Sequence, residues 1–168
     1  MTVSLLVAAA ENDVIGDGGR IPWRLPADMR RFAAMTSGHS VVMGRTTYDS
    51  IIAKLGRPLP GRHSVVISHR PGIPADAVTW VSSPTAAAQV CEHLEPGAWF
   101  VIGGASVYQQ MLAYVDAIHL TRVHAHVPGD TTMPPGWLDG FSPATHERVN
   151  DPAADLNYSF IHLGRDGR

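Results

Sequence analysis

One carboxylate in the sequence occupies an unusual position for a charged group. Asp28 falls in a predicted helix, within a stripe of apolar residues at helical spacing. The stripe consists of Leu25, Phe32 and Met35. Burial raises the pKa of a carboxyl group, and its charged form then needs hydrogen-bond donors, which a ligand with an amidine-like pair of N–H groups would supply. The alternative is an acid that only complements the dipole of its helix.

The segment before this helix is predicted to be an irregular loop. Residues 15–25 read IGDGGRIPWRL, with three glycines and a proline before Trp23. The run GDGG does not directly follow a strand and leads into Ile-Pro, so it is not predicted to be a phosphate-binding turn. The loop and its tryptophan would instead wall off a pocket whose acid is Asp28.

Two further segments share the pattern of apolar strand, glycine and helix. They are VVMGRTT (41–47) and FVIGGASVY (100–108). Glycine lets a phosphate approach the backbone closely, and the following helix presents free amide groups, so two such junctions suit a dinucleotide. The alternative is that each glycine only makes a tight turn. Neither a G-x-G-x-x-G fingerprint nor a P-loop is present.

Four polar residues follow the ends of two predicted strands. They are Arg45, Ser68, His69 and Arg70. If the fold groups them, they form an anion site suited to a terminal phosphate. If it does not, each is an ordinary polar residue of the surface.

Elements that could position these groups follow from the apolar pattern. Strands are expected at 3–10, 40–44, 64–68, VTWVS, 99–104 and 117–127, and as two strands between 145 and 163 joined by DPAAD. Helices are expected at 26–35, 46–52, TAAAQVCEHL and SVYQQMLAYV. The alternation predicts an α/β fold with a mainly parallel, eight-stranded central sheet, about four flanking helices and an antiparallel C-terminal edge. No linker divides residues 1–168, so one domain is expected.

Composition excludes several classes of function. Thirteen basic and fifteen acidic residues give a net charge of −2, which does not predict a nucleic-acid-binding surface. No apolar run is long enough to span a membrane, and no signal peptide is evident. Cys91 is the only cysteine, which indicates a reducing cytoplasm. His124 and His126 share a strand face without a third ligand at recognisable spacing, so no metal is expected.

The motifs together resemble bacterial dihydrofolate reductase over nearly the whole chain. The matching segments, in order, are VIGDGGRIPWRLPADMRRF, VVMGRTTYDSI, RPLPGR, VIGGASVYQQ and HLTRVHAHVPGDTTMP. The resemblance implies NADPH-dependent reduction of dihydrofolate to tetrahydrofolate, with hydride transfer to C6 and a proton added at N5. It also implies a monomer.

The same resemblance implies roles for individual residues on the substrate side. Asp28 matches the acid that holds the pterin, Thr121 the threonine bonded to that acid, and Trp23 the loop tryptophan that helps order a water. Arg62 matches the arginine that pairs with the glutamate α-carboxylate of folate. The walls of the pterin and benzoyl pocket are expected to be Leu6, Val7, Met29, Phe32, Ile51 and Leu59.

On the cofactor side, the resemblance implies that Ile21 lies near the nicotinamide and that Gly103 and Gly104 are joined by a cis peptide bond. Other matching positions are Ala8, Ile15, Gly44, Arg45, Thr46, Thr47, Ile102, Ser106, Val107, Tyr108 and Thr131. The sequence departs from the family pattern at four places. Ala105 replaces a third glycine, Val7 is bulkier than the small residue often found there, His119 stands where a tyrosine is frequent, and IIAKLG is a few residues longer than in the shortest members.

Two other functions fit part of the pattern. A pyridine-nucleotide reductase of the same fold, such as the one in riboflavin synthesis, would keep the I-G-G junction but does not need W-x-L-P-x-D or Arg62. A catalytically idle nucleotide-binding paralogue would be expected to lose Asp28 or Trp23, and both are present.

Overall fold

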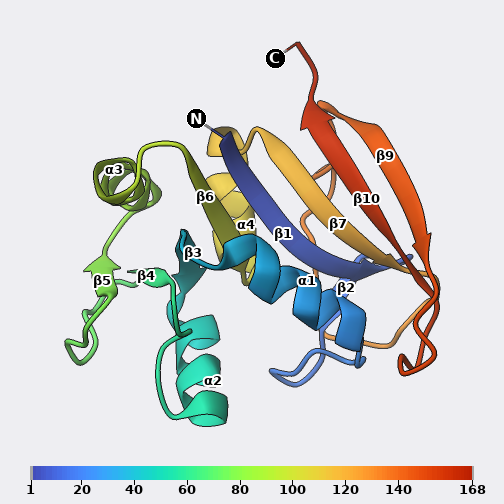
Figure 1. The fold of residues 1–168 in the computed structure, drawn as a ribbon, viewed down its shortest axis with the longest axis horizontal. Helices are drawn as coiled ribbons and strands as arrows, with labels where there is room; N and C mark the ends of the chain where they lie inside the picture. The colour runs from blue at the N-terminus through green and yellow to red at the C-terminus, as the bar shows by residue number, and fades with distance from the viewer. Residues whose placement is uncertain (1, 168) are drawn as a thin grey trace.

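The computed structural model describes residues 2–167 and has the expected α/β architecture (Figure 1). Eight strands form one sheet in the order β5-β4-β3-β6-β1-β7-β10-β9. These strands are β1 (Thr2–Ala10), β3 (Ser40–Gly44), β4 (His63–Ile67), β5 (Val78–Val81), β6 (Ala98–Gly103), β7 (Ala117–Val123), β9 (Phe141–Val149) and β10 (Tyr158–Arg165). The helices are α1 (Pro26–Thr36), α2 (Arg45–Leu55), α3 (Pro84–Leu94) and α4 (Ala105–Met111), with a 3₁₀ turn, η1 (Leu112–Tyr114).

The direction of the strands confirms the mixed sheet that the sequence predicts. Every neighbouring pair from β5 to β7 is parallel, whereas β10 is antiparallel to both β7 and β9. Parallel neighbours need a crossover, which the helices provide, and the last strands are joined without one. The antiparallel part of the sheet is therefore its C-terminal edge.

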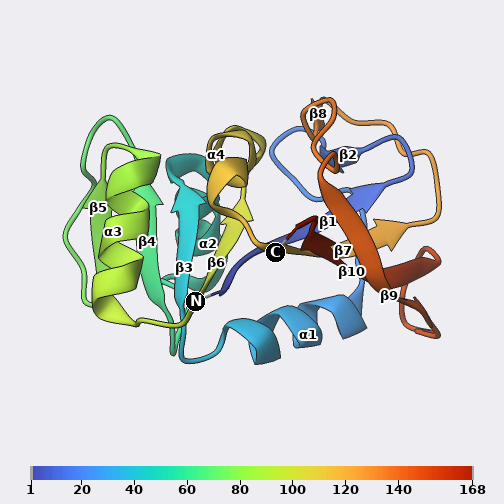
Figure 2. The same cartoon turned by 90° about the horizontal axis from the view of Figure 1, so that it is seen from above.

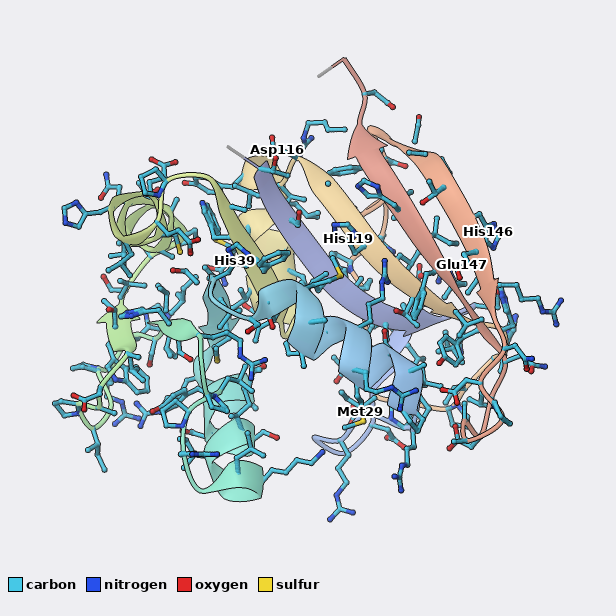
Figure 3. All side chains as sticks on the ribbon, in the orientation of Figure 1. Met29, His39, Asp116, His119, His146 and Glu147 are labelled. Atoms are coloured by element: carbon cyan, nitrogen blue, oxygen red, sulfur yellow. The ribbon has the colours of Figure 1, made fainter. Side chains whose placement is uncertain are left out.

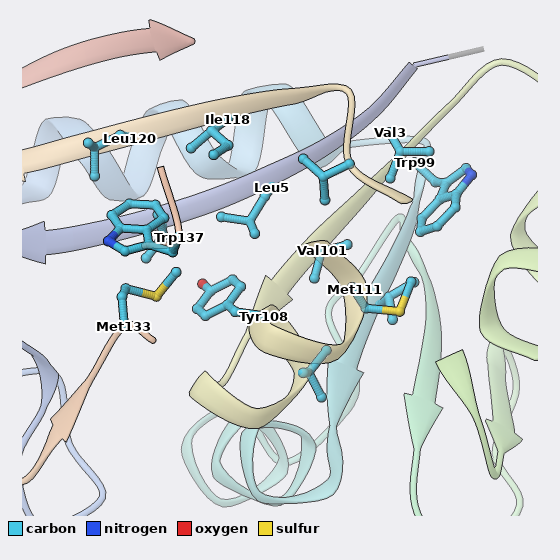
Figure 4. Close-up of a cluster of buried hydrophobic side chains, with 14 of the residues drawn as sticks. Val3, Leu5, Trp99, Val101, Tyr108, Met111, Ile118, Leu120, Met133 and Trp137 are labelled. Atoms are coloured by element: carbon cyan, nitrogen blue, oxygen red, sulfur yellow. The ribbon is translucent and has the colours of Figure 1, made fainter. Parts of the chain in front are cut away.

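The sheet is covered on both faces, so its central strands are apolar on both sides. Along β1, Leu5 and Val7 belong to a core shared with α3 and α4, whereas Leu6 belongs to a second core with residues of α1 and α2. Figure 2 shows α1 and α4 on opposite sides of the sheet. Figure 4 shows the first core, where Trp137 packs beside Tyr108 of α4.

Three details differ from the expected elements. The strand predicted over 117–127 ends at Val123, because its partner β10 begins opposite that residue. The helix predicted from SVYQQMLAYV stops at Met111 and continues as η1. A second, two-stranded sheet of β2 (Val14–Gly16) and β8 (Thr131–Thr132) is not evident in the apolar pattern, since both strands are very short.

Candidate active site

The first turn of α1 carries Asp28 over strand β7. Thr121 Oγ1 of β7 donates a hydrogen bond of 2.6 Å to Asp28 Oδ1. Burial raises the pKa of the Asp28 carboxyl group above its ordinary value, and the hydrogen bond from Thr121 and the charge of Arg31 oppose this rise. The apolar stripe thus predicted a desolvated acid correctly, and the other carboxylate oxygen is left for a ligand to bind.

The start of α1 is held by a turn that lies far away in the sequence. Asp151, between β9 and β10, accepts hydrogen bonds from the backbone N–H of Ala27 at 3.0 Å and from the Tyr158 hydroxyl at 2.7 Å. Because α1 has no side-chain cap of its own, Asp151 satisfies one of the free amides of its first turn. The position of Asp28 therefore depends on the β9–β10 turn.

The glycine-rich loop before α1 is tied to the fold at both ends. The N–H of Gly18 donates to Asp130 at 3.0 Å, and the N–H of Arg24 donates to Asp155 at 3.3 Å. Trp23 is buried in a third core between these ties. Ile21 is 68% exposed, so the middle of the loop keeps an apolar side chain in solvent.

Most of the expected pocket wall comes together on the face of the sheet under α1. Four of its members pack in the second core: Leu6, Phe32, Ile51 and Leu59. Val7 does not, because successive residues of a strand point to opposite faces and its side chain joins the first core. Met29, labelled in Figure 3, lies on α1 and is 55% exposed.

The guanidinium of Arg62 is fixed at the other end of α1. Its Nη1 donates to Thr36 Oγ1 at 3.1 Å and its Nε to the Pro60 carbonyl at 3.0 Å. Thr36, the last residue of α1, lies eight residues after Asp28, which is about 12 Å along a helix. An elongated ligand with an N–H-rich head and an anionic tail would contact both ends.

The two strand–glycine–helix junctions lie side by side in the sheet. Gly103 of β6 pairs with Met43, the neighbour of Gly44 in β3. A side chain at Gly44 would come within 3.1 Å of Val107, and one at Gly104 within 3.8 Å of Thr47. Neither α2 nor α4 has a side-chain cap, so the amides of both first turns can bind an anion.

The peptide bond between Gly103 and Gly104 is cis, as the resemblance implied. Ala105 and Ser106 follow it in the first turn of α4, and Thr46 occupies the first turn of α2. Ile15 of β2 and Thr131 of β8 come from the small sheet, where Thr131 pairs with the neighbouring Gly16. Ala8 and Ile102 are partly buried at the edges of two cores.

The predicted anion-binding residues are close together at the ends of β3 and β4. Arg45 Nη1 donates to the Arg70 carbonyl at 3.0 Å, and Ser68 Oγ donates to the same oxygen at 2.7 Å. Ser68 and His69 line a cavity of about 370 Å³ beside Trp80. The predicted residues are thus grouped, but Arg70 contributes here a carbonyl oxygen that accepts the hydrogen bonds of Arg45 and Ser68 and cannot itself bind a phosphate.

Tyr108 has a structural contact that the sequence did not indicate. Its hydroxyl, fully buried, lies 2.6 Å from the Leu6 carbonyl and 3.0 Å from the Ile102 carbonyl. Burial raises the pKa of this phenol, so it remains a hydrogen-bond donor. Tyr108 therefore joins β1 to β6, and its hydroxyl is directed at these carbonyls.

Neither a metal centre nor a membrane-spanning helix is found within residues 2–167. No group of three or more His, Cys, Asp or Glu side chains in that range could hold a metal ion. Instead, the ring nitrogens of His124 contact Glu11 at 2.9 Å and Ser159 at 2.7 Å. No helix of the same residues is long and apolar enough to cross a membrane.

Comparison with known proteins gives one family. A sequence model described as dihydrofolate reductase matches residues 2–165. The chain is 43% identical over 166 residues to dihydrofolate reductase HdrB of Haloferax volcanii, covering 90% of this chain and 86% of that protein. It is 41% identical over 172 residues to dihydrofolate reductase type 3 of Salmonella typhimurium, covering 98% and 99%.

Among solved structures, the fold is similar to that of dihydrofolate reductase from Enterococcus faecalis complexed with NADP(H) and RAB-propyl. The TM-score is 0.85 at 25% identity, and the match covers 98% of this chain and 96% of the other. The similarity in sequence and the similarity in fold therefore point to the same family, each over nearly the whole chain.

Proposed function

The chain belongs to the dihydrofolate reductase family, and from that premise we propose how its residues carry the reaction. It is an oxidoreductase that reduces 7,8-dihydrofolate to 5,6,7,8-tetrahydrofolate with NADPH. When bound, NADPH would supply the hydride that C6 of the pterin accepts, and N5 would take up a proton. The observation that carries the assignment of roles is the hydrogen bond between Asp28 and Thr121, which fixes a desolvated acid at one end of α1.

Asp28 is proposed to bind the N3 and 2-amino edge of the pterin with its carboxylate. Thr121 holds one oxygen of that carboxylate, so the acid is oriented before a ligand arrives. The negative charge favours the protonated pterin and thereby promotes protonation at N5, although Asp28 does not touch N5. Trp23 closes the loop over this pocket and helps order a water there.

The residues at the two glycine junctions fit the cofactor. A pyrophosphate needs close approach to backbone amides. Glycine at positions 44 and 104 leaves room for this approach, because a Cβ atom there would occupy the space beside Val107 and Thr47. The group of Arg45, Ser68 and His69 lies at the neighbouring strand ends. Arg45 has N–H donors besides the one bonded to the Arg70 carbonyl, and Ser68 can donate to a phosphate when its hydroxyl turns away from that carbonyl. We infer that this group holds the 2′-phosphate that distinguishes NADPH from NADH.

Arg45→Ala should weaken NADPH binding and leave NADH binding nearly unchanged. A hydrogen bond to a charged group contributes about 1.5–3 kcal/mol, which corresponds to roughly a ten- to hundred-fold loss of affinity. Fluorescence titration with each cofactor measures the change. Lys54→Ala, which removes an exposed cation near the other end of α2, is the matched control. Equal losses for NADPH and NADH would refute the assignment.

The function is tested by following NADPH oxidation spectrophotometrically with dihydrofolate, beside a blank without folate. Oxidation that depends on dihydrofolate is the expected result. A reductase of the same fold acting on another substrate would oxidise NADPH only with that substrate, and an idle paralogue would bind NADPH without turnover. Dihydrofolate-independent or absent oxidation by a protein that binds NADPH would therefore contradict the proposal.

We further infer a cytoplasmic monomer in which residues 1–168 act as one domain and do not bind nucleic acid. The net charge of −2 supports the last point. The lone Cys91 is buried, and burial raises the pKa of its thiol to about 12, so it is poorly suited to disulfide formation. Light scattering on the purified protein tests the monomer: a mass of twice 18.1 kDa would contradict it.

A further inference from the structure

A second charged residue of α1 lies one turn after the active-site acid, over the same face of the sheet. The guanidinium carbon of Arg31 lies 4.0 Å from the centre of the Phe160 ring on β10. Phe160 pairs with Thr121 of β7 on one side and with Glu147 of β9 on the other. Directly opposed residues share a face, so these three form a row across the sheet that ends at Glu147, which Figure 3 labels.

The helix places its own charges along this row. Asp28 is bonded to Thr121 at one end, and Arg31 stacks on Phe160 in the middle. Residues three apart on a helix are neighbours, so the two charges face each other. Glu147 stands at the far end of the row and is exposed. The guanidinium of Arg31 therefore interacts with an acid on either side, one desolvated and one in solvent.

None of the other titratable groups discussed next adds a positive charge that could act on Asp28 in place of Arg31. Tyr108 and Tyr158 interact with Asp28, and burial raises the pKa of both phenols, so they stay neutral. His119 of β7 interacts with Arg31 and stacks on His162, with ring centres 4.5 Å apart. Burial lowers the pKa of His119 to about 4, so it is uncharged at neutral pH. The cation that acts on Asp28 in this row is Arg31.

We propose that Arg31 is a positioning residue for the reaction: held against Phe160 and shared between Asp28 and Glu147, it keeps Asp28 as a carboxylate facing the substrate. The inference rests on the proposed function only for its catalytic consequence. An isolated acid in this apolar stripe would tend to take up a proton, and a neutral acid would no longer favour the protonated pterin. Glu147 moderates the effect because it draws part of the same positive charge.

The direct test is a pH titration of Asp28 in the ligand-free protein by ¹³C NMR of labelled aspartates, with the Asp28→Asn spectrum as assignment. Arg31→Gln should raise the pKa of Asp28 by about half a unit to one unit, the size expected for a partly screened charge several ångströms away. In Arg31→Lys, which keeps the positive charge, the pKa of Asp28 should stay close to its wild-type value. Arg30→Gln, which removes an exposed charge one residue away, is the matched control and should change little.

Glu147→Gln separates an electrostatic role from a structural one. Removing this acid leaves the Arg31 charge to Asp28, so the pKa of Asp28 should fall, opposite in sign to Arg31→Gln. Disturbed packing of α1 would instead move both variants in one direction. Shifts of one sign in both variants, or equal shifts in Arg31→Gln and Arg30→Gln, would overturn the proposal.

In the enzyme, the same change should appear in the pH profile of hydride transfer. Arg31→Gln should lower the rate of hydride transfer at pH values near the raised pKa of Asp28, because more of the acid is then neutral and does not favour the protonated pterin. The KM for dihydrofolate should change less than this rate does. If dihydrofolate is not the substrate, the NMR titration still decides the role of Arg31, so failure of the inference and failure of the proposed function are distinguishable.

Discussion

Asp28→Asn should lower the rate of hydride transfer at pH 7 by orders of magnitude, on the scale of about 10²- to 10⁴-fold for lost proton-transfer catalysis. Asparagine keeps the size of the side chain and can still accept the hydrogen bond from Thr121. It lacks the charge that favours the protonated pterin. The rate should recover partly in acid, where solvent protonates the substrate without help.

The measurement is the single-turnover rate of hydride transfer across pH, beside NADPH affinity, which should be unchanged. Folding provides a second readout. Because burial raises the pKa of Asp28, its charged form costs stability at pH values above that raised pKa. Asp28→Asn should thus melt at or above the wild-type temperature at pH 7. The difference should vanish as pH falls below the ordinary value of an aspartate.

Near-normal turnover of Asp28→Asn at neutral pH would contradict the proposed role. Asp28 would then be only an acid in the first turn of α1 that complements the helix dipole. A slow variant that also melts much lower and binds NADPH weakly would point instead to a structural role. The two measurements together separate these outcomes.

Arg62→Ala should weaken dihydrofolate binding about 10²-fold while a small dihydropterin without the glutamate tail binds almost as before. The guanidinium is held by Thr36 and the Pro60 carbonyl through two of its nitrogens, so it is oriented in advance for a carboxylate. A charge-assisted hydrogen bond lost from a preorganised site has this order of effect. KM and binding titrations with both substrates measure it.

Thr36→Val offers a milder variant of the same contact. It removes the oxygen that accepts the hydrogen bond from Arg62 but keeps the volume of a side chain that is fully buried. Dihydrofolate binding should fall less than in Arg62→Ala, again with little effect on the small dihydropterin. If both substrates lost affinity alike in Arg62→Ala, the arginine would be structural and the tail would bind elsewhere.

The sequence by itself determined the features that depend on neighbouring residues. The apolar run of β1 predicted a strand buried on both faces, and the order of strands and helices predicted the mixed sheet. The stripe around Asp28 predicted a desolvated acid, because helical spacing places Leu25 and Phe32 on its side of α1. The motifs in the sequence then indicated the dihydrofolate reductase family, and the comparisons confirm it.

Only the tertiary structure decided which distant groups meet. Thr121 is 93 residues from Asp28, and no local pattern shows that their side chains touch; the resemblance supplied that pairing, and the fold shows the bond. Val7 turned away from the expected wall because strand geometry assigned it to the other face. The short β2 and β8 and the end of β7 likewise depend on partners remote in the chain.

Arg31 shows the same division within one helix. The sequence places it one turn after Asp28, which identifies a neighbour but not a role. Its stacking on Phe160 and its position between Asp28 and Glu147 follow from where α1 packs against β7 and β10 and from the register of β10 with β7 and β9. Crossing and register are fixed by the packing of the whole core, so local periodicity does not contain them.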